Sequence, residues 1–160
     1  MEEKNIVFLD VDGVLNFTGT RAMSPEGFTG ILPSRVTVLK RIVDENNALI
    51  VLTSTWRECW NKDDKSLQSP DGDYLDRLME EGGLRICDKT DGDLLLRGHN
   101  IRDWLEKNPH KGWIVIDDEV FPDYRECRIS EHLIQTGTGM NGGLKEKHIL
   151  AARRLFGRSC

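Results

Sequence analysis

Two aspartates stand at the end of an apolar run near the start of the chain, in the stretch IVFLDVDGVLN. Asp10 and Asp12 are separated by one residue, and Gly13 follows them directly. A carboxylate can attack phosphorus to form an aspartyl-phosphate, and a nearby second acid can protonate the leaving oxygen and then deprotonate water. The pair therefore suits phosphoryl transfer, with Asp10 as nucleophile, Asp12 as acid/base and Gly13 permitting the turn.

Two further apolar runs end in polar residues that fit the same chemistry. The run ALIVL leads into Thr53 and Ser54, whose hydroxyl groups can hold phosphate oxygens, and the run WIVI leads into Asp117 and Asp118. In open parallel sheets, ligands bind beyond the carboxyl ends of the strands. If the three runs are neighbouring strands, four carboxylates and two hydroxyls converge on one spot.

Crowded carboxylates repel one another unless a positive group lies among them. Oxygen-only ligands match Mg²⁺ better than zinc, and a protein-bound Mg²⁺ is commonly shared with a substrate phosphate. The predicted magnesium ligands are Asp10, Asp12, Asp117 and Asp118. A cation on the protein is also expected to contact the phosphate, because arginine can hold phosphate through two parallel hydrogen bonds. Arg97 is the first candidate for this cation and Lys89 the second.

The elements that must position these residues follow from the apolar patterns. Strands are predicted at 5–9, 48–52, 84–87, 113–116 and 133–135, and helices at 34–45, 73–81, 98–107 and 144–156. Strands that alternate with helices indicate an α/β fold with a mainly parallel sheet. Ser34 is expected to be the N-cap of its helix. Residues 16–33 and 136–143 are predicted loops, and 57–83 either a small lid or a surface excursion.

Composition limits the classes of protein to consider. A chain of 160 residues fits one domain over 1–160, and 38% hydrophobic with 31% charged residues fits a globular protein. No apolar run approaches the ~20 residues that cross a bilayer, and the acidic start MEEKNIVFLD lacks the features of a secretory signal. We therefore expect a cytoplasmic protein with no membrane contact, whose four cysteines are free thiols.

The charge is unevenly distributed. The net charge is −5, but residues 145–160 carry five Lys or Arg residues and one acid. An acidic body argues against broad, nonspecific binding to a nucleic-acid backbone. The basic C-terminal helix leaves a local contact with a partner open, although such a face is more often only solvated.

The motifs resemble a known group of enzymes. The segments FLDVDGVLN, IVLTSTW and VIDDE are similar to those of the haloacid dehalogenase-like (HAD) superfamily of phosphotransferases. The segments LLRGHNIRDWLEKNP, WIVIDDE and GGLKEKHILAARRL resemble a small, largely capless HAD group related to Swiss Army Knife RNA-repair phosphatases. The resemblance spans 6–155 and implies a three-layer Rossmann-like fold with a minimal cap or none, Mg²⁺ dependence and phosphatase activity.

The resemblance also implies roles for single residues. Asp10 falls on the nucleophile, and Asp12 on the acid/base whose main-chain carbonyl also binds the metal. Thr53 falls on the phosphate-binding hydroxyl, and Asp118, with Asp117, on the metal-binding acid. Arg97 fits the group's RG-x-x-I-x-x-WL pattern and so occupies the place of the phosphate-stabilising cation.

The substrate is the least determined property. With no inserted cap to select a small substrate, our first hypothesis is a phosphatase of nucleic-acid phosphate ends or nucleotides. A phosphatase of small metabolites or of phosphoproteins is the alternative within the same chemistry. A catalytically idle, Mg²⁺-binding interaction module is the alternative from another class, and the sequence does not predict the oligomeric state.

Overall fold

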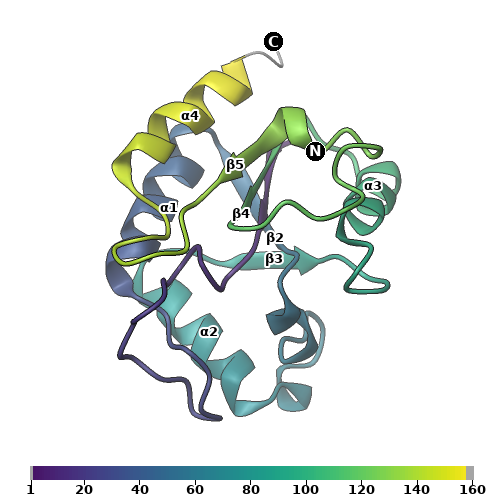
Figure 1. Cartoon of the computed structure of the whole chain (residues 1–160). Helices are drawn as coiled ribbons and strands as arrows, with labels where there is room; N and C mark the ends of the chain where they lie inside the picture. Colours follow the sequence, from purple (N-terminus) through teal and green to yellow (C-terminus); the bar gives the residue numbers. More distant parts are fainter. Residues whose placement is uncertain (1, 158–160) are drawn as a thin grey trace.

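The computed structural model describes residues 2–157, and its centre is a five-stranded parallel sheet (Figure 1). The strand order is β3-β2-β1-β4-β5, which confirms the predicted α/β fold with a Rossmann-like sheet. The strands are β1 (Asn5–Leu9), β2 (Ala48–Leu52), β3 (Ile86–Lys89), β4 (Trp113–Asp117) and β5 (Leu133–Gln135). The α-helices are α1 (Pro33–Glu45), α2 (Pro70–Glu81), α3 (Arg97–Lys107) and α4 (Glu146–Gly157). Three short 3₁₀ helices are η1 (Thr55–Glu58), η2 (Lys65–Leu67) and η3 (Ser130–His132).

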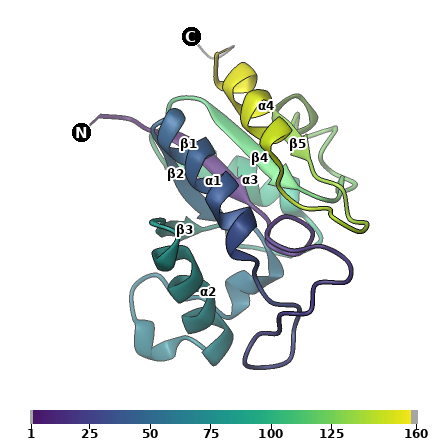
Figure 2. The ribbon, with the colours of Figure 1, turned by 90° about the vertical axis from the view of Figure 1, so that its left-hand side faces the viewer.

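Helices cover both faces of the sheet. Helices α1, α2 and α4 pack on one face with Val7 and Leu9 of β1, and α3 packs on the other face with Ile6 and Phe8 (Figures 1 and 2). Successive strand residues point to opposite faces, so a strand that is covered on both sides must be apolar throughout. This explains why β1 reads as an unbroken apolar run.

The register of the central strands positions the predicted site. Leu9, at the end of β1, is paired with Leu52 of β2 and Ile116 of β4. All three strands run parallel, so the residues that follow them emerge at one edge of the sheet. The polar groups that end the three apolar runs are therefore neighbours, as the sequence predicted.

Several element boundaries differ from the prediction. Helix α1 begins at Pro33 with Leu32 as its N-cap residue, and no side chain caps it, so the prediction of Ser34 as N-cap is wrong. Helix α2 begins at Pro70 rather than at 73, with the Ser69 hydroxyl accepting from the N–H of Gly72 (3.5 Å). Proline fits the first helical position because its φ is fixed near the helical value. Strand β3 begins two residues later than predicted and α3 one residue earlier, at Arg97.

The segment 57–83 is anchored to the core at both ends, and its 62–67 stretch is an exposed surface excursion. Trp60, Leu75 and Met79 are buried in the larger core cluster, so the segment belongs to the body of the protein. It also supports the 16–33 loop, because the N–H of Ile31 donates to the hydroxyl of Tyr74 (3.0 Å). The loop itself holds only a single antiparallel bridge between Met23 and Thr29.

The structure also bears on the expected free cysteines, the basic C-terminal helix and the expected lack of a membrane span. Cys59, Cys87 and Cys127 are free thiols, and Cys160 lies outside the described residues. Arg153 of α4 forms an ion pair with Glu45 of α1 (2.9 Å), so part of the basic C-terminal segment serves an intramolecular contact. Between residues 2 and 157 there is no helix with the length and apolar character of a membrane span. A cytoplasmic location stays a prediction.

Candidate active site

Asp10 and Asp117 face one arginine at the carboxyl edge of the sheet. Nη1 of Arg97 lies 3.1 Å from Oδ1 of Asp10 and 2.9 Å from Oδ2 of Asp117. All three side chains are buried, and the guanidinium of Arg97 is covered by the Phe121 ring at 4.1 Å. Three segments that are distant in the sequence thus meet: the end of β1, the end of β4 and the first residue of α3.

The Asp117 carboxylate is held on all sides by protein groups. Its Oδ2 accepts from the Tyr124 hydroxyl (2.8 Å) as well as from Arg97, and its Oδ1 accepts from the N–H of Glu119 (3.0 Å). An acceptor with so many partners is fixed in place and has little capacity left for a further ligand. This arrangement suits Asp117 to orienting Arg97 more than to binding a metal ion directly.

Two hydroxyl groups follow β2, and their surroundings differ. Thr53 is buried, and its Oγ1 has no hydrogen-bond partner among the described residues. Ser54 is also buried, but its Oγ accepts from the N–H of Trp56 (3.1 Å) and caps η1. A buried hydroxyl without a partner is energetically costly, so Thr53 is the more suitable of the two for a phosphate oxygen.

Asp12 lies on the open side of the site. Its carboxylate accepts from Nδ2 of Asn16 (3.1 Å) and from Nε1 of Trp56 (3.2 Å). Asp12 is exposed, whereas Asp10, two residues earlier, is buried. The side chain of Asp12 is therefore oriented by the protein but remains in contact with solvent, as a group that exchanges protons with water must be.

The turn after β1 brings Asp118 close to the first strand. Gly13 has a φ of +80°, a conformation in which other residues are strained. A Cβ atom at Gly13 would also clash with the Asp118 carboxylate. The predicted need for glycine at this position thus has two causes, the backbone conformation and the close approach of Asp118, which follows the neighbouring strand β4.

The acid cluster fits a hard divalent cation. Carboxylate oxygens of Asp10, Asp117 and Asp118 all lie within 4.8 Å of one another, and Arg97 faces two of these acids. The Asp12 carboxylate is not part of this group, so a contribution from Asp12 would have to come from its main-chain carbonyl. All of these donors are oxygens, which is the ligand set that Mg²⁺ prefers.

Burial and the neighbouring charges shift the pKa values of Asp10, Asp118 and Arg97. Burial raises the pKa of Asp10 well above its ordinary value, the Asp117 charge raises it further, and Arg97 opposes both. Burial also raises the pKa of Asp118. Burial lowers the pKa of Arg97, but the charges of Asp10 and Asp117 outweigh it, so the net shift is upward. A bound cation would favour the ionised carboxylates that this environment otherwise disfavours.

The two candidate cations are distinguished by their contacts. Nζ of Lys89 donates to the main-chain carbonyls of Arg57 (2.9 Å) and Trp60 (2.8 Å), so this ammonium group serves the 57–60 segment. Arg97 instead contacts Asp10 itself. The geometry therefore favours Arg97 over Lys89 as the group beside a phosphate on Asp10.

Arg57 is a buried cation that the sequence did not point out. Its guanidinium donates to the carbonyl and hydroxyl of Thr90 (both 3.0 Å) and to the carbonyl of Gly92. These contacts fasten the 90–96 loop, which ends at Arg97, to the segment after β2. Tyr124 and Asn16 were also missed. Asn16 lies four residues after Asp12 inside the quoted FLDVDGVLN motif, but nothing in the local sequence marks Tyr124.

A comparison with protein families identifies the chain. The model of the HAD domain found in Swiss Army Knife RNA repair proteins matches residues 6–149. The chain belongs to this family. The match confirms the resemblance drawn from the motifs, and it makes the chain a HAD domain of a type that suggests a phosphatase-type hydrolase. No curated protein matches the chain.

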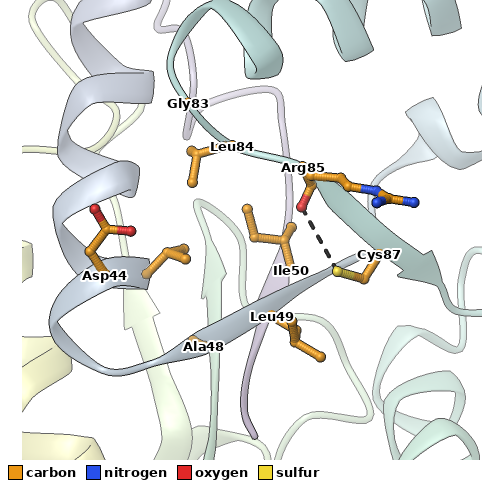
Figure 3. Close-up of a pocket in the computed structure, with 9 residues that line it drawn as sticks. Asp44, Ala48, Leu49, Ile50, Gly83, Leu84, Arg85 and Cys87 are labelled. Atoms are coloured by element: carbon orange, nitrogen blue, oxygen red, sulfur yellow. Dashed lines mark hydrogen bonds between the residues drawn. The ribbon is translucent and has the colours of Figure 1, made fainter.

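A hollow separate from the candidate active site is drawn in Figure 3. It has a volume of about 410 Å³ and is formed by the start of β2, the end of α1, the 83–85 segment after α2 and Cys87 of β3. Its wall is largely apolar, with Leu49, Ile50 and Leu84, while Asp44 and Arg85 lie on opposite sides. Because the strands are parallel, this hollow is at the amino edge of the sheet, opposite the acid cluster.

Proposed function

We propose that this HAD domain is a Mg²⁺-dependent phosphatase that forms an aspartyl-phosphate on Asp10 and acts on nucleotides or on the phosphate ends of nucleic acids. The observation that carries the proposal is the setting of Asp10. Its carboxylate is buried at the end of β1 beside Arg97, at the edge where β2 ends in the unpartnered hydroxyl of Thr53. These groups supply a nucleophile, a cation and a hydrogen-bond donor for one phosphoryl group.

The reaction proceeds in two displacements. In the first, an oxygen of Asp10 bonds to phosphorus, the bond from phosphorus to the leaving oxygen breaks, and Asp12 gives its proton to that oxygen. In the second, Asp12 takes a proton from water, the water oxygen bonds to phosphorus, and the bond to Asp10 breaks. The products are an alcohol and inorganic phosphate, and both aspartates return to their starting states.

The other polar groups assist by position and charge. Arg97 and the hydroxyl of Thr53 hold the phosphoryl oxygens, and Arg97 is itself oriented by Asp117 and Tyr124. Asp10, Asp118 and the main-chain carbonyl of Asp12 would hold Mg²⁺. When bound, the ion neutralises negative charge on the phosphoryl group and on the acids around it.

The substrate class rests on the family. The family description names RNA repair proteins, which favours a phosphate carried by a nucleotide or nucleic acid. The 16–33 loop contains one bridge and no inserted cap, so a nucleotide linked to a longer chain is not excluded from the entrance. An open entrance would equally admit other phosphate esters, so the substrate must be tested directly.

The decisive experiment measures phosphate release from a panel, with Mg²⁺ and with EDTA. The panel holds p-nitrophenyl phosphate, 3′- and 5′-mononucleotides, and oligonucleotides with a 3′- or 5′-phosphate. We expect Mg²⁺-dependent release from nucleotides or oligonucleotide ends that is lost in the Asp10→Asn variant. Release that survives this substitution would contradict the aspartyl-phosphate mechanism. No release from any substrate, with Mg²⁺ bound, would contradict the proposed activity and favour an interaction module.

A further inference from the structure

A small cavity opens beside Asp12 and Asp118, between the 16–33 loop and the 136–143 loop. Its volume is about 220 Å³, and its lining residues are Asp12, Gly13, Asn16, Phe17, Thr18, Thr29, Asp118 and Thr138. Pockets for drug-sized ligands are typically about 300–1,000 Å³. The cavity therefore suits one small group, such as a single nucleoside, and is too small for several nucleotides.

The walls of this cavity are fastened to each other. The N–H of Thr18 donates to the carbonyl of Thr138 (3.1 Å), which joins the two loops directly. Arg35 donates from Nε (3.1 Å) and Nη2 (2.9 Å) to the carbonyl of Gly142, and its guanidinium lies 5.2 Å from the centre of the Phe17 ring. These contacts make the cavity a built feature of the two loops.

The position of Asp12 indicates which part of the substrate would occupy the cavity. In the proposed reaction, Asp12 gives a proton to the leaving oxygen, so that oxygen must lie within hydrogen-bond distance of the Asp12 carboxylate. Asn16 and Trp56 hold this carboxylate, and Asp12 forms part of the cavity wall. The group attached to the leaving oxygen consequently occupies the cavity, while the phosphate lies toward Asp10.

The side chains that line the cavity favour an uncharged leaving group over one that carries a phosphate. Three threonines and Asn16 provide neutral hydrogen-bonding groups, and Phe17 provides a flat apolar surface. Among the described residues, no lysine or arginine lines the cavity, and its two charged members are the acids Asp12 and Asp118. A second phosphate in this space would meet neutral hydrogen-bonding groups but no lysine or arginine side chain of the lining, and a charge removed from water without a partner costs binding energy.

We infer that the cavity binds the nucleoside of a nucleoside monophosphate and selects against a second phosphate on the same sugar. The hydroxyls of the sugar match the threonines and Asn16, and the base matches the Phe17 ring. The terminal sugar of a phosphorylated polynucleotide end also carries the phosphodiester that joins it to the chain, so the inference favours mononucleotides over polynucleotide ends. It rests on the proposed phosphatase activity and narrows its substrate class.

The test compares kcat/KM for p-nitrophenyl phosphate, adenosine 5′-monophosphate, adenosine 3′,5′-bisphosphate and a 5′-phosphorylated trinucleotide. We expect the monophosphate to exceed the bisphosphate and the trinucleotide by at least about tenfold. Turnover of p-nitrophenyl phosphate with equal values for the three nucleotides would overturn the inference and leave the phosphatase proposal standing. Absence of turnover on every substrate would instead contradict the phosphatase proposal.

Charge variants sharpen this test. Thr138→Lys places a cation at the cavity, so the ratio of monophosphate to bisphosphate kcat/KM should fall severalfold relative to the wild type. Thr29→Lys adds a cation from the other loop and should lower the same ratio, which guards against local misfolding of one loop. Thr37→Lys is the matched control, because Thr37 is exposed on α1 and lies outside the cavity. An unchanged ratio in both cavity variants would contradict the inference.

Discussion

The candidate active site has two halves, one buried and one open to solvent. In the buried half, Asp10, Arg97 and Asp117 are removed from water, and Arg97 pairs with both carboxylates. In the open half, Asp12 and Asp118 line a solvent-connected cavity whose other lining residues are neutral. The difference indicates a division of tasks: the buried half handles the phosphoryl group, common to all substrates, and the open half handles the leaving group, which varies.

Asp10→Asn should have the largest effect, because it removes the nucleophile of the buried half. We expect turnover of every substrate to fall on the order of 10⁴-fold or more. Without Mg²⁺ the melting temperature should be equal or higher, since the amide relieves repulsion with Asp117. The measurements are phosphate release and thermal unfolding, with Asp44→Asn, an exposed carboxylate on α1, as control. A destabilised Asp10→Asn protein would argue against charge strain at this position.

Asp12→Asn should separate the two halves by its dependence on the leaving group. Loss of the proton donor should slow nucleotide hydrolysis by about 10²–10⁴-fold. The reaction of p-nitrophenyl phosphate should suffer much less, because its leaving group needs no proton. Comparing kcat for the two substrates provides the check, and an equal loss on both would show that Asp12 serves the phosphoryl group instead.

Arg97→Ala should reduce turnover about 10²-fold and also destabilise the protein, because two buried carboxylates lose their cation. Breaking a buried ion pair on one side costs about 3–5 kcal/mol. Denaturant unfolding in EDTA measures the stability, and steady-state kinetics measures the activity. Lys89→Ala is the matched control for the competing cation. A larger loss of turnover in the lysine variant would reverse the assignment of the phosphate-stabilising group.

Magnesium should stabilise the protein through its carboxylate ligands at the edge of the sheet. We expect Mg²⁺ to raise the melting temperature, since it offsets the burial and repulsion that raise the pKa of Asp10 and Asp118. Asp118→Asn should abolish most of this shift, whereas Tyr124→Phe should retain it because the Tyr124 hydroxyl donates to Asp117, which is not among the proposed Mg²⁺ ligands. Differential scanning fluorimetry with and without Mg²⁺ decides the point. A full shift in Asp118→Asn would exclude this carboxylate as a main ligand.

The smallest expected effect concerns His99 and Asp123, which contact each other at the start of α3, next to Arg97. Asp123 accepts from the N–H groups of Gly98 and His99 at the start of α3, and from Nδ1 of His99 (2.8 Å). The hydrogen bond to Asp123 raises the pKa of His99. A raised histidine pKa stabilises the fold below about pH 6.5, and this stabilisation is lost as the pH rises through the folded value.

The wild-type protein should therefore melt above the His99→Gln variant at pH 5.5, and the gap should narrow by pH 8.5. Activity with p-nitrophenyl phosphate should change little across the two proteins, because His99 supports α3 from the solvent side. Melting curves at both pH values test this prediction. A gap that widens with rising pH would contradict the assigned sign.

The sequence by itself determined the sheet and the acids at its edge. Apolar runs that end in Asp10, Thr53 and Asp117 predicted both the strands and their common carboxyl edge, since a parallel strand covered on both faces must be apolar throughout. Gly13 was also predictable, because a sharp turn after a strand needs a permissive backbone. Helix starts were less predictable. Helix α1 begins after Leu32, which capping preferences do not indicate, whereas the start of α2 at Ser69 and Pro70 fits those preferences and was overlooked.

Only the tertiary structure decided how the acids divide their work. The sequence places Asp117 and Asp118 side by side, but the fold turns one toward Arg97 and Tyr124 and the other toward Gly13. Likewise, Lys89 and Arg97 were both reasonable cations until their contacts separated them. Such choices depend on atoms brought together from distant segments, and no local pattern of residue types records those distances.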